Sequence, residues 1–143
     1  MVIDSKFFGQ IEAADEDIIY FEEGLLGLED VKKFILVDIE GESSFKCLQS
    51  ADSQEIAFIV ISPWEVEEGY QVDIDDEELI TLQDNDLSDI FIYSIVTLSQ
   101  DKMTANLIGP IILNTKTKRG KQIVLNNSKY TTKHIIKYFA KKE

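Results

Sequence analysis

Short apolar runs, separated by polar turn residues, predict that this 143-residue chain is built from β-strands. The strongest run spans residues 90–98, where nearly every side chain is β-branched or aromatic, as pleated strands favour. Both alternating sets are mostly apolar, so we expect a central strand with a packed layer on each side. Polar residues interrupt the run at 99–102, and the extended pattern resumes from Thr104 to Leu113. These two runs predict a β-hairpin at the core of the fold.

Other short stretches show the same patterning, and their regular spacing indicates an antiparallel all-β class. We expect further strands at residues 7–12, 18–21, 34–37, 45–50, 56–61, 122–125 and around 130–132. One short helix is expected where Asp75 or Asp76 caps the N-terminus and Glu77 and Glu78 occupy the first turn. The predicted fold class is therefore all-β and mainly antiparallel, a small β-barrel-like or sandwich structure with one or two short helices.

Chain length predicts a single domain covering residues 1–143. Lysines recur every four residues at 129, 133, 137 and 141, which would place them on one face of a helix. A strand around residue 130 fits the same region equally well. We therefore expect a last strand followed by a basic C-terminal tail or helix within 131–143.

The composition indicates the cellular compartment of the protein and limits the kinds of catalytic or metal site that it can form. Cys47 is the sole cysteine, so no internal disulfide can form, and a small buried side chain is the expected role. No apolar run approaches the roughly 18 residues of a membrane span, and the N-terminus lacks signal-peptide features. We expect a cytoplasmic protein without membrane contact. With His134 as the lone histidine, neither a histidine-based catalytic triad nor a multi-histidine metal site can be assembled, and no cofactor is expected.

Charge is distributed unevenly along the chain. Residues 1–114 carry five basic and 26 acidic side chains, whereas residues 115–143 carry nine basic side chains and one acidic. An acidic body repels nucleic acid and attracts a basic protein, so we expect no direct nucleic-acid binding. Solubility alone is the simpler interpretation of the net charge, and for the net charge by itself it is the one we favour.

The candidate site is a segment that mixes acids with aromatics, a composition that suits a protein-binding patch. Its members are Trp64, Glu67, Glu68, Tyr70, Asp73, Asp75 and Asp76. A second candidate is the loop Gly24–Leu28, where two glycines flank Leu25 and Leu26. Leu25, Leu26 and Leu28 either plug one end of the core, which we favour, or form a contact surface.

Two alternatives give the acids another role. Residues 73–78 resemble the first half of a calcium-binding loop, but the glycine at its sixth position and the glutamate at its twelfth are missing. Helix capping is the simpler explanation. A carboxylate-based hydrolase is compatible with the residue types, although no acid stands isolated in apolar sequence, where burial would raise its pKa.

A series of short motifs runs nearly the length of the chain. It comprises Phe8-Gly9-Gln10, Tyr20-Phe21-Glu22-x-Gly24-Leu25-x-Gly27, Leu48-Gln49-Ser50, Phe58 to Pro63, Thr104-Ala105-Asn106-Leu107-x-x-Pro110-Ile111 with Asn114, Gln122-x-Val124-Leu125 and Tyr130-x-x-Lys133-His134. The series resembles the FliW family of bacterial flagellar assembly factors. Two segments depart from the family pattern: Gly-Leu-Pro-Gly-Phe-Glu is Gly24-Leu25-Leu26-Gly27-Leu28-Glu29 here, and Ala-Pro-Ile is Gly109-Pro110-Ile111.

The resemblance implies a small, non-enzymatic, β-barrel-like binding protein. Family members bind flagellin in the cytoplasm. When flagellin is exported, they bind instead the RNA-binding translational regulator CsrA and relieve its repression of flagellin mRNA. The resemblance thus implies two protein partners, and the acidic body indicated by the charge pattern is compatible with a basic one.

Overall fold

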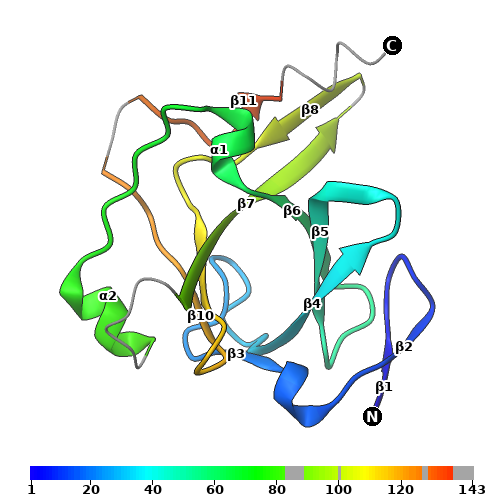
Figure 1. Cartoon of the computed structure of the whole chain (residues 1–143). Helices are drawn as coiled ribbons and strands as arrows, with labels where there is room; N and C mark the ends of the chain where they lie inside the picture. The colour runs from blue at the N-terminus through cyan, green and yellow to red at the C-terminus, as the bar shows by residue number, and fades with distance from the viewer. Residues whose placement is uncertain (83–88, 100, 127–128, 137–143) are drawn as a thin grey trace.

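Short strands closed into a ring dominate the computed structural model, which describes residues 1–82, 89–99, 101–126 and 129–136 (Figure 1). The elements in chain order are β1 (Val2–Asp4), β2 (Gln10–Glu12), the 3-10 helix η1 (Asp15–Asp17), β3 (Ile19–Phe21), β4 (Lys33–Ile39), β5 (Glu42–Ser50), β6 (Ala57–Ile61), α1 (Pro63–Val66), α2 (Asp76–Thr81), β7 (Ile90–Ser99), β8 (Lys102–Ala105), β9 (Ile111–Asn114), β10 (Arg119–Gln122) and β11 (His134–Ile135).

Seven of these strands form a closed barrel, in the order β7-β6-β5-β4-β3-β10-β9, with β9 paired back to β7. Each neighbouring pair in this ring is antiparallel except β3 and β10, which run parallel. The prediction of a mainly antiparallel, barrel-like all-β fold with short helices is confirmed. In the described part of the chain, neither α1 nor α2 has the length and apolar character needed to cross a bilayer.

The largest aromatic side chains of the barrel strands meet in one of several buried apolar clusters. The rings of Phe21 and Phe34 are both fully buried and pack edge to face, with their centroids 5.1 Å apart. Gly120 on β10 lies opposite Phe21 in the parallel pair. A Cβ atom at position 120 would lie 2.5 Å from the Phe21 ring, so only glycine leaves room for this aromatic side chain. The cluster around them comprises Ile19, Leu25, Leu48, Val60, Ile111 and Leu113.

Strand β7 takes part in two different pairings along its length. Its first half, Ile90–Tyr93, pairs with β9 and closes the barrel, whereas Val96–Ser99 pairs with β8 in a hairpin that leaves the ring. The predicted core hairpin is therefore present. The expectation that β7 is covered on both faces is wrong at two positions, because Phe91 and Leu98 are 49% and 65% exposed.

The second arm of that hairpin is not the continuous strand predicted from Thr104 to Leu113. The Asn106 side-chain Oδ1 accepts hydrogen bonds from the N–H groups of Ile108 and Gly109, at 3.1 and 2.8 Å, and so stabilises a turn. Pro110 follows this turn and has no N–H to offer a sheet. The turn separates β8 from β9, so the two can pair with opposite halves of β7.

Three other strand boundaries differ from the sequence prediction. Gly9 has a φ of 70°, which leaves only Gln10–Glu12 of the predicted strand 7–12 in a sheet. Strand β10 begins at Arg119 rather than at residue 122, and the last strand is His134–Ile135 rather than a strand around 130–132. The predicted helix is confirmed: α2 begins at Asp76, and the carbonyl of Asp75 accepts a hydrogen bond from Leu79 N–H. Residues 137–143 of the predicted tail lie outside the described residues.

Cys47 on β5 is fully buried, and this burial raises the pKa of its thiol from 9.0 to about 11. Because the folded state favours the neutral thiol, its contribution to stability is complete below pH 9 and is lost as the pH rises through 11. By pH 11 the loss amounts to about 2 kcal/mol. We expect Cys47→Ala to lower the free energy of unfolding at pH 8. At pH 11 the same substitution should lower it by about 2 kcal/mol less. Urea unfolding of both proteins at the two pH values measures this, and an unchanged difference would contradict it.

Candidate functional site

The segment from Trp64 to Asp76, which mixes acids with aromatics, begins in α1. Its own aromatic side chains hold it against the barrel. Trp64 Nε1 donates a 2.9 Å hydrogen bond to the Tyr70 carbonyl, and the two rings pack edge to face at 5.6 Å. Tyr70 is only 4% exposed, and its hydroxyl donates to the Leu107 carbonyl at 2.7 Å. Tyr70 therefore anchors the segment to the core, while Trp64 remains 41% exposed. Burial, and after it the neighbouring Tyr130, raises the pKa of Tyr70, because both disfavour a charged phenolate there.

The acids of this segment separate into two places on the surface. Glu67 Oε1 lies 3.6 Å from His134 Nε2, beside a cleft of about 310 Å³ that also involves Lys129 and Tyr130. Asp73 and Asp75 line a different groove. Glu68 and Asp76 are exposed. Acids that are neighbours in the sequence therefore lie on two distinct surfaces of the folded protein.

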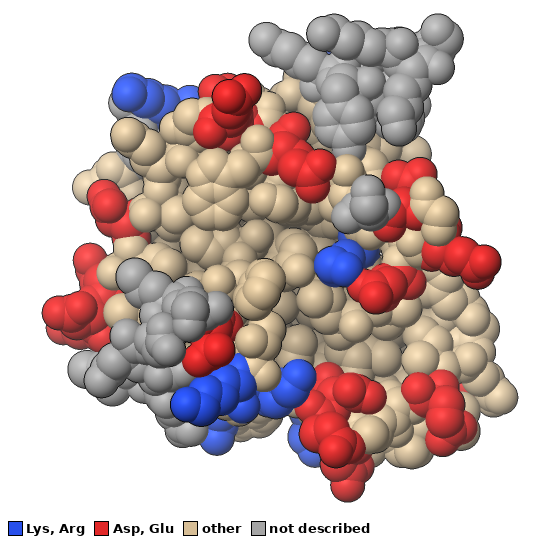
Figure 2. Space-filling view, in the orientation of Figure 1, with Lys and Arg blue, Asp and Glu red and all other residues tan. Residues whose placement is uncertain are grey.

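The larger groove, which we call the acidic groove, has a volume of about 500 Å³. One wall is formed by Gln71, Asp73, Asp75 and Glu78, and the other by residues 122–126. Acidic side chains also surround much of the visible face of the molecule, whereas lysine and arginine gather in a few small groups (Figure 2). The groove therefore combines local and overall negative charge with a concave shape.

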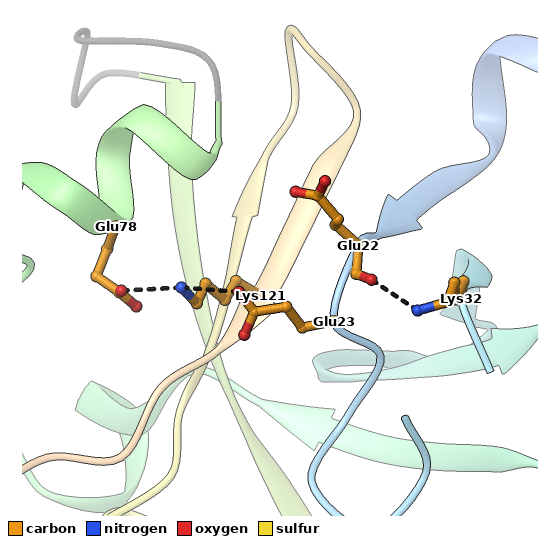
Figure 3. A network of polar contacts seen from close by, with 5 residues as sticks. All are labelled: Glu22, Glu23, Lys32, Glu78 and Lys121. Atoms are coloured by element: carbon orange, nitrogen blue, oxygen red, sulfur yellow. Dashed lines mark hydrogen bonds and ion pairs between the residues drawn. The ribbon is translucent and has the colours of Figure 1, made fainter. Parts of the chain in front are cut away.

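Lys121 joins the helix α2 to the barrel beside this groove (Figure 3). Its Nζ lies 2.9 Å from Glu78 Oε1 and 3.5 Å from Glu23 Oε2, and its side chain is only 14% exposed. Burial alone would lower its pKa, but the hydrogen bond and charge of Glu78, together with Glu23, outweigh it and raise the pKa. The basic composition of residues 116–121 predicts a solvated turn, and this prediction is wrong for Lys121, whose side chain is mostly buried in the ion pair with Glu78.

The loop Gly24–Leu28 lies against the same part of the molecule. Gln122 Oε1 accepts a 3.0 Å hydrogen bond from Leu26 N–H, and Gln122 Nε2 donates to the Gly109 carbonyl at 2.9 Å. Leu25 is buried and packs in the barrel core, as the core-plug interpretation requires. Leu26 is 58% exposed, so the same interpretation is wrong for this side chain. The structure thus brings Leu26 and the acids of the groove to the two sides of Gln122.

Calcium binding is one of the two alternative roles for the acids of residues 73–78. Among the described residues, no group of three or more histidine, cysteine, aspartate or glutamate side chains is placed to hold a metal ion. The backbone from Asp76 onward is helical, so this segment does not wrap around a central point as a calcium loop does. Position 84, where the closing ligand of such a loop would stand, lies outside the described residues.

The sequence and the structure of this chain are both similar to those of known flagellar assembly factors. A sequence model of the family described as FliW protein matches residues 2–136. The chain is 44% identical over 139 residues to the flagellar assembly factor FliW of Thermoanaerobacter pseudethanolicus, covering 95% of this chain and 93% of that protein. It is 39% identical over 138 residues to that of Bacillus subtilis, covering 95% and 96%. A crystal structure of the flagellar assembly factor FliW superimposes with a TM-score of 0.89 at 37% identity, over 95% of this chain and 96% of that one.

Proposed function

Because this chain belongs to the FliW family of flagellar assembly factors, we propose that it is a non-enzymatic regulatory protein that acts by binding other proteins. Its partners are flagellin and the translational regulator CsrA. In the cytoplasm it binds flagellin, and when flagellin has been exported it binds and antagonises CsrA, so that flagellin mRNA is translated. Which of the two partners is bound is determined by mass action, because the partner present in excess occupies the protein.

The observation that supports this proposal is the surface on which the acidic groove and the exposed Leu26 meet. An RNA-binding regulator such as CsrA is basic, and a negative surface accelerates its approach through long-range attraction. An exposed apolar side chain beside a polar groove provides the short-range contact that a protein interface needs. The domain covering residues 1–143 would carry both features.

Capture of purified CsrA and of purified flagellin on the immobilised protein tests the proposal directly. Binding of each partner alone, and release of CsrA by added flagellin, is the expected result. Failure of both partners to bind at low salt would refute it.

Charge reversal tests the role of the acids in partner association. Lysine in place of Glu67, Glu68, Asp75 and Asp76 is expected to slow association with CsrA about tenfold at low salt and to flatten its salt dependence. Stopped-flow or surface-plasmon measurements at several salt concentrations give both quantities.

A control variant with the same change in net charge separates location from total charge. Lysine at four exposed acids of η1 and the β5–β6 turn, namely Asp15, Glu16, Asp52 and Glu55, provides it. We expect this variant to slow association much less. Equal slowing in both variants would mean that net charge alone matters, and an unchanged rate in the first variant would place the interface elsewhere.

A further inference from the structure

Strand β10 loses one of its neighbours before the extended chain ends. Parallel pairing with β3 stops at Gly120, which lies opposite Phe21, and β3 then turns away, with Gly24 N–H bonded to the Phe21 carbonyl. Beyond Gln122, where β10 ends, no described residue bonds its backbone to the side of the chain that faces β3 within β10.

On the other side, the chain beyond β10 remains fixed in an extended form. The N–H of Ile123 donates to the Pro110 carbonyl at 3.0 Å, and the N–H of Leu125 to the Ile108 carbonyl at 2.7 Å. This is the spacing of an antiparallel ladder, although Pro110 has no N–H to return a bond. Because backbone groups alternate along an extended chain, those of Val124 and Asn126 face the open side. Among the described residues, neither of these two N–H groups has a backbone or side-chain acceptor.

The open backbone forms one wall of the acidic groove. The opposite wall is the segment from residue 71 to Asp75, which lines the groove together with residues 122–126. Val72, Ile123 and Leu125 pack in one apolar cluster, together with Ile74 and with the buried Leu82, which directly follows α2. That cluster keeps the two walls in fixed relation while their backbones remain apart.

We propose that the acidic groove binds an extended peptide segment of a partner protein, which adds to the open side of residues 122–126 as an additional strand. Main-chain hydrogen bonds to Val124 and Asn126 would fix the segment, as in other cases of strand addition. This inference rests on the proposed function and specifies how a partner is held.

The groove also determines the chemistry of that segment. Asp73 and Asp75 are exposed acids on the facing wall, so lysine or arginine side chains are favoured there. Glu78 is already engaged by Lys121 and contributes less. Val124 is 64% exposed, and Leu26, held by Gln122, is 58% exposed, so apolar side chains have contacts near the same edge. A segment that alternates basic and apolar residues fits both features.

Amide hydrogen exchange at single residues tests this inference. In the free, ¹⁵N-labelled protein, we expect fast exchange at Val124 and Asn126 and slow exchange at Ile123 and Leu125. A capped hexapeptide of alternating lysine and valine should slow exchange at Val124 and Asn126 at least tenfold, and each partner protein that binds should do the same. A matching peptide of glutamate and valine should leave both amides unchanged.

A pair of variants locates the charge contact. The double variant Asp73→Asn and Asp75→Asn should weaken binding of the lysine-valine peptide at least fivefold. The control is Glu67→Gln with Glu68→Gln, which removes the same charge on the other side of Gln71 and should leave peptide binding unchanged. Equal weakening by both variants would overturn the assignment of the basic side chains to this groove.

The outcomes for the two proposals differ. If CsrA or flagellin binds while exchange at Val124 and Asn126 is unchanged, strand addition is wrong and the proposed function stands. If neither partner binds but the lysine-valine peptide protects these amides, the groove binds peptides and the proposed function is wrong. Slow exchange at both amides in the free protein would show that the chain itself fills the groove, and would overturn the inference.

Discussion

Replacement of Gly120 by alanine is expected to lower the free energy of unfolding by about 2–3 kcal/mol, since the new methyl group overpacks the barrel core. Its Cβ would lie 2.5 to 2.8 Å from three atoms of the Phe21 ring. That ring cannot move aside easily, because it is fully buried and packs against Phe34. Urea unfolding of the two proteins at neutral pH measures the difference.

A double-mutant cycle shows whether Phe21 is the cause. Phe21→Leu alone should cost roughly 1–2 kcal/mol, because it removes buried atoms from the core. In that background, Gly120→Ala should cost at least about 1 kcal/mol less than in the wild-type protein, because the smaller side chain leaves room for the methyl group. Strict additivity of the two substitutions would show that the strain arises elsewhere.

Replacement of Gly24 by alanine is expected to cost about 3 kcal/mol, from two separate causes. Gly24 has a φ of 66°, a conformation that alanine adopts only with strain. A Cβ there would also lie 2.6 Å from backbone atoms of Leu28 and Glu29, which cannot rotate away as a side chain would. Thermal or urea unfolding gives the loss, and displacement of the exposed Leu26 should weaken partner capture at the same time.

Gly27 provides the matched control in the same loop. Its φ is 84°, but no described atom outside residues 26–28 lies within 4 Å of the position a Cβ would take. Gly27→Ala should therefore cost only the conformational strain, about 1 kcal/mol. Equal losses at the two glycines would mean that close backbone approach contributes nothing at Gly24.

The barrel class was predictable because it depends on patterns that act over a few residues. The long apolar run of β7, the alternation in β5 and the acids at the start of α2 each determine a local structure, and each was identified from the sequence. The division of β7 between two partners was not. It depends on the turn made by Asn106 and Pro110, whose short apolar neighbours resemble a continuing strand.

The candidate site was only partly predictable, for a related reason. Composition identifies the segment from Trp64 to Glu78, but it cannot show that Tyr70 turns inward to reach the Leu107 carbonyl. Nor can it show that Gln122, distant in sequence, contacts Leu26. Contacts between residues nearly a hundred positions apart leave no periodic signal. The sequence alone therefore does not reveal that the two walls of the acidic groove lie together, because only the closed barrel brings them into contact.

The parallel pairing of β3 with β10 also has a consequence for synthesis on the ribosome. Residue 20 must find residue 119 before the ring is complete, so a nascent chain that lacks its last quarter keeps unpaired sheet edges on both β3 and β7. Such edges are templates for intermolecular pairing, and contacts of this sequence separation form slowly. The interval between translation of β7 and of β10 is thus the period in which this protein is most vulnerable to aggregation.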